Sequence, residues 1–152
     1  MAFRAALGLL IGGLMTAGLA VAQTPSDAKI QTGQWESTET VSEMVNPLLS
    51  STQIANRLAK PAVVKFCVKS ASLRDMLVGT DKAGLCSGEV AIANGKISGS
   101  RNCTAGLKGT RKIEGAYTVT TVDTMRETTT ETQKGPAHTK SHLVSKRIGD
   151  CS

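Results

Sequence analysis

The sequence is poor in aromatic residues, which make up 3% of its 152 residues. After residue 22 the only aromatic side chains are Trp35, Phe66 and Tyr117. A core with so few large side chains buries little apolar area per residue, so cross-links would have to supply part of the stability. The composition therefore predicts a small domain that depends on its disulfides.

Familiar catalytic motifs are also missing. The sequence has no G-x-S-x-G elbow, no P-loop and no H-E-x-x-H zinc motif. A cysteine nucleophile needs a free, activated thiol, and each of the four cysteines has an available disulfide partner. Asp150, beside Cys151, is interpreted as a turn residue that accepts backbone hydrogen bonds. We therefore expect no catalytic residues, no bound cofactor and no enzymatic activity; a hydrolase with a site outside the known motifs is an alternative.

The N-terminal segment carries no charged side chain except Arg4, and its apolar run continues through Leu19. Ala20-Val-Ala22 then places small residues at the −3 and −1 positions of a cleavage site, which is typical of a secretory signal peptide over residues 1–22. An uncleaved membrane anchor is the competing interpretation. The run is diluted by glycines and lies near the lower limit of about 20 apolar residues for a span. We expect cleavage after Ala22 and no stable membrane span afterwards.

Cleavage of 22 residues from 152 would leave 130, which is enough for one domain and too few for two. The chain is divided into a signal peptide (1–22), a flexible polar lead-in (23–32) and a single disulfide-bonded domain (33–152). The formal net charge falls from +6 to +5, because Arg4 is the only charge removed. A basic domain favours anionic partners, but export excludes nucleic acid. We expect a periplasmic protein or, alternatively, a secreted one.

Strand patterns dominate the sequence after the lead-in. Eight of the fifteen residues in 118–132 are threonine, whose branched Cβ disfavours a helix and suits a pleated sheet. Alternating and apolar runs bounded by turn residues predict the other strands. The expected strands cover residues 33–44, 63–68, 90–92, 96–98, about 106–113, 117–132 and 137 to about 148, with turns at Glu114-Gly115 and Gln133–Pro136.

Two short helices are predicted between the early strands. Asn46 is a good N-cap and Pro47 suits the first helical position, so a helix over 47–59 is expected, with its apolar stripe covering the sheet. Ser70 is expected to cap a second helix over 70–78. The fold class is therefore mainly β: an antiparallel meander that curls into a barrel or half-barrel, with one or two short helices.

The clearest local signal is Asn94-Gly95, which favours a type I′ hairpin turn because both residues tolerate positive φ. The residue numbers of facing pairs then add up to 189, which places Cys86 opposite Cys103 in a non-hydrogen-bonded pair. Such pairs have Cα atoms about 4.5 Å apart, near the short end of what a disulfide accepts. Of the three possible connectivities, we predict Cys86–Cys103 and Cys67–Cys151.

The histidines His138 and His142 invite a metal hypothesis. In a strand their Cα atoms would lie about 13 Å apart, too far for both imidazoles to reach one ion. We expect no metal site. If Gln133–Pro136 is a four-residue loop, cross-strand partners become Glu131–His138, Glu127–His142 and Asp123–Lys146, a solvated surface of opposite charges.

The layout of motifs resembles a known family. Gly33-x-Trp35-Glu36 opens the domain, Cys67-Val-Lys-Ser follows, Cys86 and Cys103 flank a hairpin, and Lys146-Arg-Ile-Gly-Asp-Cys151 closes the chain. This is similar to a family of small exported proteins of Gram-negative bacteria that is catalogued only as a domain of unknown function. The chain departs from the family pattern in two places. It has Lys146-Arg147 where paired arginines are usual, and Cys67-Val-Lys-Ser-Ala where Cys-Leu-Thr-Pro-Glu is common. The resemblance implies location and fold and is silent on chemistry.

Two functions remain in view beside the hydrolase. The first is a non-enzymatic module that binds a small apolar, lipid-like or anionic ligand or supports the cell envelope, because a barrel mouth is a common ligand site. The second is a protein-interaction module that contacts an envelope protein through a strand edge or the 47–59 helix.

Overall fold

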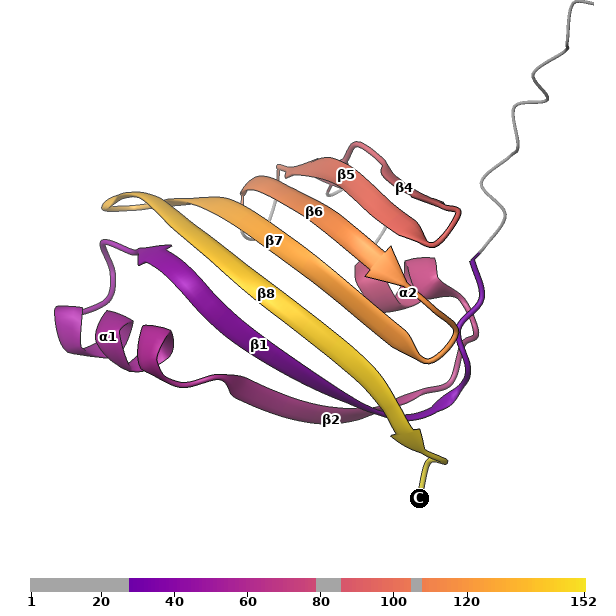
Figure 1. Cartoon of the computed structure of the whole chain (residues 1–152). Coiled ribbons are helices and arrows are strands. Elements are labelled where there is room, and N and C mark those ends of the chain that lie inside the picture. The colour runs from indigo at the N-terminus through magenta and orange to yellow at the C-terminus, as the bar shows by residue number, and fades with distance from the viewer. Residues whose placement is uncertain (1–27, 79–85, 105–107) are drawn as a thin grey trace, which may run out of the picture.

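The protein is described by a computed structural model over residues 28–78, 86–104 and 108–152. Eight strands form one antiparallel sheet in the order β2-β1-β8-β7-β6-β5-β3, with β4 also paired to β5 (Figure 1). The sheet curls without closing, which confirms the mainly β, half-barrel meander. The elements are β1 (Gly33–Val45), α1 (Ser51–Ala59), β2 (Ala62–Val68), α2 (Leu73–Val78), β3 (Cys86–Ser87), β4 (Val90–Ala93), β5 (Lys96–Cys103), β6 (Gly109–Tyr117), β7 (Thr121–Thr132) and β8 (Gly135–Gly149).

The hydrophobic core lies on one face of the sheet, which we call the inner face. Side chains alternate along each strand, so every second residue points to this face. Trp35 of β1 is fully buried there and packs with Leu73 of α2, which is also fully buried. The helix α2 thus covers part of the inner face, while the opposite, outer face is solvated. The core cluster consists of Ile30, Trp35, Val68, Leu73, Val90, Ile92, Ile97 and Val122.

The segment before β1 differs from the expected flexible lead-in over 23–32, which is wrong from Ala28 onward. Ile30 is only 3% exposed and belongs to the core cluster. Its neighbours in the sequence are mostly polar, so no apolar pattern predicted its burial. Its amide donates to the Ala71 carbonyl at 2.9 Å, and the Gln31 amide donates to the Val119 carbonyl at 2.7 Å. These bonds tie residues 28–32 to the start of α2 and to the β6–β7 turn. The expected signal peptide lies outside the described residues.

Both helices begin later than predicted. Ser50, not Asn46, caps α1: Ser50 and Gln53 form a capping box, while the Asn46 side chain accepts from the Leu48 amide in a separate turn. No residue of α1 is buried, so the expectation that its apolar stripe covers the sheet is wrong. The helix α2 begins at Leu73, after Ser72, whose hydroxyl accepts from the Asp75 amide at 3.2 Å.

Two predicted turns are also corrected. The strand β6 runs through Glu114-Gly115 to Tyr117, and the turn lies at Thr118–Thr121, closed by the Thr118 amide on the Thr121 carbonyl at 2.8 Å. Gly115 is needed inside the strand because a Cβ there would collide with the Asp123 carbonyl oxygen. The β7–β8 loop has two residues rather than four, so Thr132 pairs with Gly135 instead of Ala137.

The β4–β5 hairpin has the predicted register. Ala93 pairs with Lys96 and Cys86 pairs with Cys103. The turn residues Asn94 (φ 51°) and Gly95 (φ 75°) both have the positive φ that a type I′ turn requires. Within the described residues, neither helix is long and apolar enough to cross a membrane.

Candidate functional site

A cavity of about 330 Å³ lies on the inner face, between α2 and strands β4 to β7. Its volume is near the lower end of the about 300–1,000 Å³ that is usual for ligand pockets. The apolar part of its wall is formed by Leu77 of α2, Val90 of β4 and Ile113 of β6. The remaining lining residues are Arg101, Cys103, Arg111, Lys112, Arg126 and Thr128.

Three arginines from three successive strands meet at this cavity. Arg101 of β5 pairs directly with Arg111 of β6, so both side chains leave the same face of the sheet. Arg126 of β7 pairs with Ile113, which places it diagonally across from Arg111 on that face. Arg111 is exposed, whereas Arg101 and Arg126 are half-buried. The cavity therefore combines an apolar wall with guanidinium groups at different depths.

The guanidinium of Arg126 is the most strongly desolvated charge of the site. Its Nε atom is buried and has no hydrogen-bond partner within the described structure. Burial lowers the pKa of Arg126, and the nearby charge of Glu39 on β1 opposes that shift. Since an arginine remains protonated at any physiological pH, the result is a half-buried positive charge with one buried, unpaired donor.

The two faces of the sheet carry different charge patterns in the described strands. On the inner face the arginines outnumber the acidic residues, which are represented by Glu39 alone. On the outer face both signs are interspersed. The outer acidic residues are Glu36, Glu43, Glu114, Asp123, Glu127 and Glu131, and the outer lysines are Lys65, Lys96, Lys112, Lys140 and Lys146.

The two histidines lie on the outer face and have different partners. His142 Nε2 lies 2.6 Å from Asp123 Oδ1. His138 Nε2 lies 3.7 Å from Glu43 and 3.8 Å from Glu127. In the described ranges no group of three or more histidine, cysteine or acidic side chains could hold a metal ion.

The predicted charge pairs across β7 and β8 are wrong, because the shorter loop shifts the register by two residues. Glu127 faces Lys140 instead of His142, and Asp123 faces Val144 instead of Lys146. A shift of two residues leaves every side chain on its predicted face. Lys140 also bonds Glu43 of β1 at 3.0 Å, which raises the pKa of Lys140 and lowers the pKa of Glu43.

The structure pairs Cys86 with Cys103 and Cys67 with Cys151, the connectivity that the hairpin register indicates. The Cα atoms lie 3.9 Å apart in the first pair and 5.6 Å apart in the second. Cys103 lines the cavity, so the first disulfide fixes the sheet edge beside it. The two bonds indicate a non-reducing, extracytoplasmic location.

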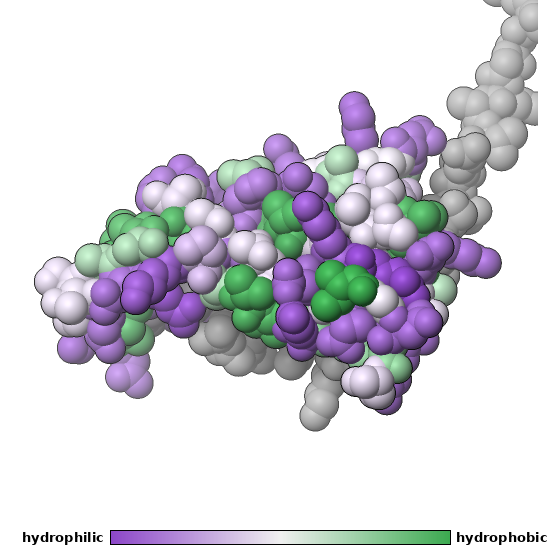
Figure 2. Space-filling view, turned by 60° about the horizontal axis from the view of Figure 1, so that its bottom comes forward, coloured by the Kyte–Doolittle hydropathy of each residue, from purple (hydrophilic) through white to green (hydrophobic). Residues whose placement is uncertain are grey.

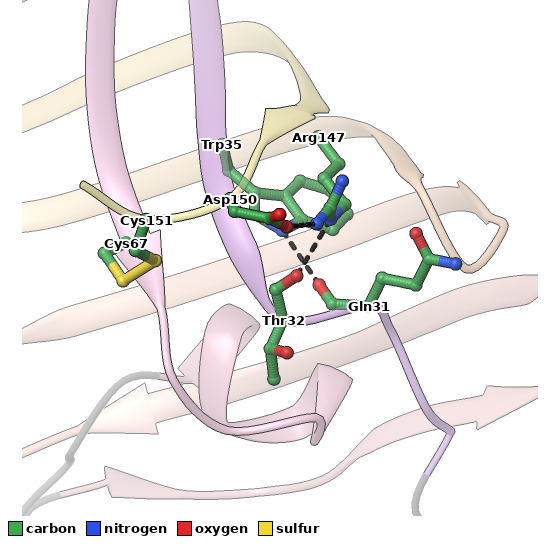
Figure 3. Close-up of a disulfide and its surroundings, with 7 residues drawn as sticks. All are labelled: Gln31, Thr32, Trp35, Cys67, Arg147, Asp150 and Cys151. Carbon is green, nitrogen blue, oxygen red and sulfur yellow. Dashed lines mark hydrogen bonds and ion pairs between the residues drawn. A yellow bond between two sulfur atoms is a disulfide. The ribbon is translucent and has the colours of Figure 1, made fainter.

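The motifs at the two ends of the domain meet around Trp35 (Figure 3). Trp35 pairs with Arg147 across β1 and β8, and its indole Nε1 donates to the Gln31 carbonyl at 3.0 Å. Arg147 Nε donates to the Thr32 carbonyl at 2.8 Å, and its Nη2 pairs with Asp150. Asp150 thus accepts from a side chain rather than from the backbone as expected. These residues hold the ends together and leave the cavity as the candidate site.

Sequence reasoning missed the arginine cluster. The three residues are 10 and 15 positions apart along the chain, and only the registers of two strand pairs bring them together. The predicted turn at Glu114-Gly115 ended β6 too early. The pairing of β6 with β7, which brings Arg126 next to Ile113, could therefore not be predicted. A signal was nevertheless present: Arg111 and Ile113 share a face in any strand that contains both.

Comparison with known proteins adds one match. A family model described as a protein of unknown function (DUF3617) matches residues 30–151. No curated protein matches the chain. No solved structure matches it either.

Proposed function

The chain belongs to the DUF3617 family of proteins of unknown function, and from this premise we propose that it is a non-enzymatic binding module of the periplasm whose inner-face cavity takes up a small amphipathic ligand. The observation that carries the proposal is the cavity itself, whose lining combines Leu77, Val90 and Ile113 with polar side chains. Pockets of this mixed character are the usual form of small-molecule sites.

The physical basis of this binding is the burial of apolar surface. Each methylene group that moves from water into an apolar wall contributes about 0.8 kcal/mol, which corresponds to roughly a fourfold change in Kd. The half-barrel leaves the cavity accessible, and α2 supplies Leu77 to its wall. The Cys86–Cys103 disulfide holds the sheet edge beside the cavity in place, so a ligand would enter a largely preformed site.

We predict that the purified, oxidised protein binds neutral alkanols and that Kd falls about fourfold for each added methylene until the cavity is full. Displacement of a neutral fluorescent dye such as Nile red measures this binding. Leu77→Trp should fill the cavity and abolish displacement, since Leu77 lines it. Leu48→Trp is the matched control, because Leu48 is 54% exposed and does not line the cavity. Equal binding by both variants would exclude the cavity.

A second candidate function is strand addition at the edge strand β2, which among the described strands pairs only with β1. Val63 and Val64 on this strand are 57% and 58% exposed. Figure 2 brings this side of the molecule forward, and its apolar patches are separated by hydrophilic side chains. Protein interfaces are usually built around larger contiguous patches, so the cavity is the better supported site.

Native mass spectrometry of the protein extracted from the periplasm separates the two functions. A bound small molecule, seen as an added mass well below that of a polypeptide, is the expected result. A protein subunit in fixed stoichiometry, lost in Val64→Lys because a lysine blocks edge pairing, would support strand addition instead.

A further inference from the structure

Three arginines from neighbouring strands line the cavity. Arg101 and Arg111 are direct cross-strand neighbours, and like charges in that position are destabilising. Arg126 adds a third positive charge on the same face, diagonal to Arg111. Of the acidic side chains on the described strands, only Glu39 of β1 shares this face, and its charge acts on Arg126. The described strands therefore place more positive than negative charge on the inner face.

The conformation of Arg126 distinguishes a binding site from an ordinary surface arginine. An arginine that merely covers apolar surface lays its stem on the wall and keeps its polar atoms in water. Arg126 instead has a buried Nε without a hydrogen-bond partner in the described structure. An unpaired buried donor destabilises the folded state, and more so when it is charged.

The geometry suits anionic oxygens. A guanidinium presents a planar fork of donors that matches a carboxylate or a phosphate. Arg111 at the exposed end and Arg126 at the buried end can contact one such group from two sides, while Leu77, Val90 and Ile113 face the apolar remainder. A bound anion would offset the positive charge that Arg111 and Arg126 bring to this face.

We propose that Arg111 and Arg126, with Arg101 beside them, bind the anionic oxygens of an amphipathic ligand, a carboxylate or a phosphate ester, whose apolar tail lies against Leu77, Val90 and Ile113. This inference deepens the proposed function and rests on it. It names the ligand class by its shared chemistry: an oxyanion head joined to an apolar tail.

The test compares four probes with the same octyl tail and different heads, nonanoate, octyl phosphate, octanol and octyltrimethylammonium, by calorimetry below their micelle concentrations. Both anions should bind about 10–100-fold more tightly than octanol, because charge-assisted hydrogen bonds are added, and the cation should bind more weakly than octanol. Acetate and inorganic phosphate serve as the tail-less arms. Weak or absent binding of these ions is expected, and binding as tight as the octyl anions would overturn the amphipathic assignment.

Arg111→Gln and Arg126→Gln should each weaken the binding of both octyl anions far more than the binding of octanol, so that most of the preference for anions is lost. Arg57→Gln is the matched control, because it removes the same charge from an exposed position on α1. Thermal unfolding checks that all three variants fold. Anion and alcohol binding of equal strength would overturn this inference and leave the proposed function standing. If no octyl compound binds the wild-type protein, the proposed function falls with it.

Discussion

Trp35→Ala is expected to lower the free energy of unfolding by about 3–5 kcal/mol, the loss typical of a large aromatic side chain in a core. Trp35 is fully buried and is the largest side chain of the core cluster. Phe66, its direct partner on β2, already packs against the core cluster. The substitution also leaves the Gln31 carbonyl without its donor and removes the ring beside Arg147. Urea unfolding of the oxidised protein measures the effect.

Trp35→Phe is the control for this prediction, because it keeps most of the apolar ring and removes the indole donor. A smaller loss, about 1–2 kcal/mol, is expected from the missing hydrogen bond and the reduced volume. If Trp35→Ala cost less than about 1 kcal/mol, the core could not be centred on this residue. Equal losses in the two variants would assign the effect to the hydrogen bond instead of to packing.

Removing the Cys67–Cys151 disulfide should have the second large effect. The double substitution Cys67→Ala with Cys151→Ala opens a loop whose ends are 84 residues apart in sequence. The chain-entropy relation gives about 4.5 kcal/mol for a loop of that length, and measured losses are often lower. The bond joins the edge strand β2 to the end of β8, on the far side of β1. Its loss should be visible as a lower midpoint in urea under non-reducing conditions.

The matched comparison is Cys86→Ala with Cys103→Ala, which opens a loop with a separation of 17 residues. The same relation gives about 3 kcal/mol, so this variant should be the more stable of the two. Both variants avoid a free thiol and therefore avoid disulfide exchange. The reverse order of stability would show that the Cys86–Cys103 bond holds structure in the folded state beyond its effect on the unfolded chain.

Local signals were sufficient for several parts of this fold. The β4–β5 register follows from Asn94-Gly95, because the positive φ values of a type I′ turn involve only the turn residues themselves. The same register places Cys86 opposite Cys103 and leaves Cys67 to Cys151. The threonine-rich strand β7 could be predicted in the same way. The branched Cβ of each threonine restricts the conformation of that residue independently of the neighbouring strands.

The sequence-based predictions were wrong where a neighbouring strand or segment selects one of several locally possible conformations. Glu114-Gly115 looks like a turn in isolation, but β7 requires a residue without Cβ at Gly115 and extends the strand past it. Asn46-Pro47 is a good helix start, yet the capping box of Ser50 and Gln53 places the start of α1 later. Ile30 is a single apolar residue in a polar segment. It is buried because it packs against core residues that are distant in the sequence.

By itself, therefore, the sequence determined the fold class, the disulfide pairs, the hairpin and the family resemblance, because each depends on short-range conformational preferences or on cysteine positions. Only the tertiary structure decided where the candidate site lies. Arg101, Arg111 and Arg126 share one cavity because the β5–β6 and β6–β7 registers add together, and each register depends on a turn outside the arginines' own segments. A residue's face has a period of two along a strand, so one misplaced turn residue would have sent a member of this cluster to the opposite side of the sheet.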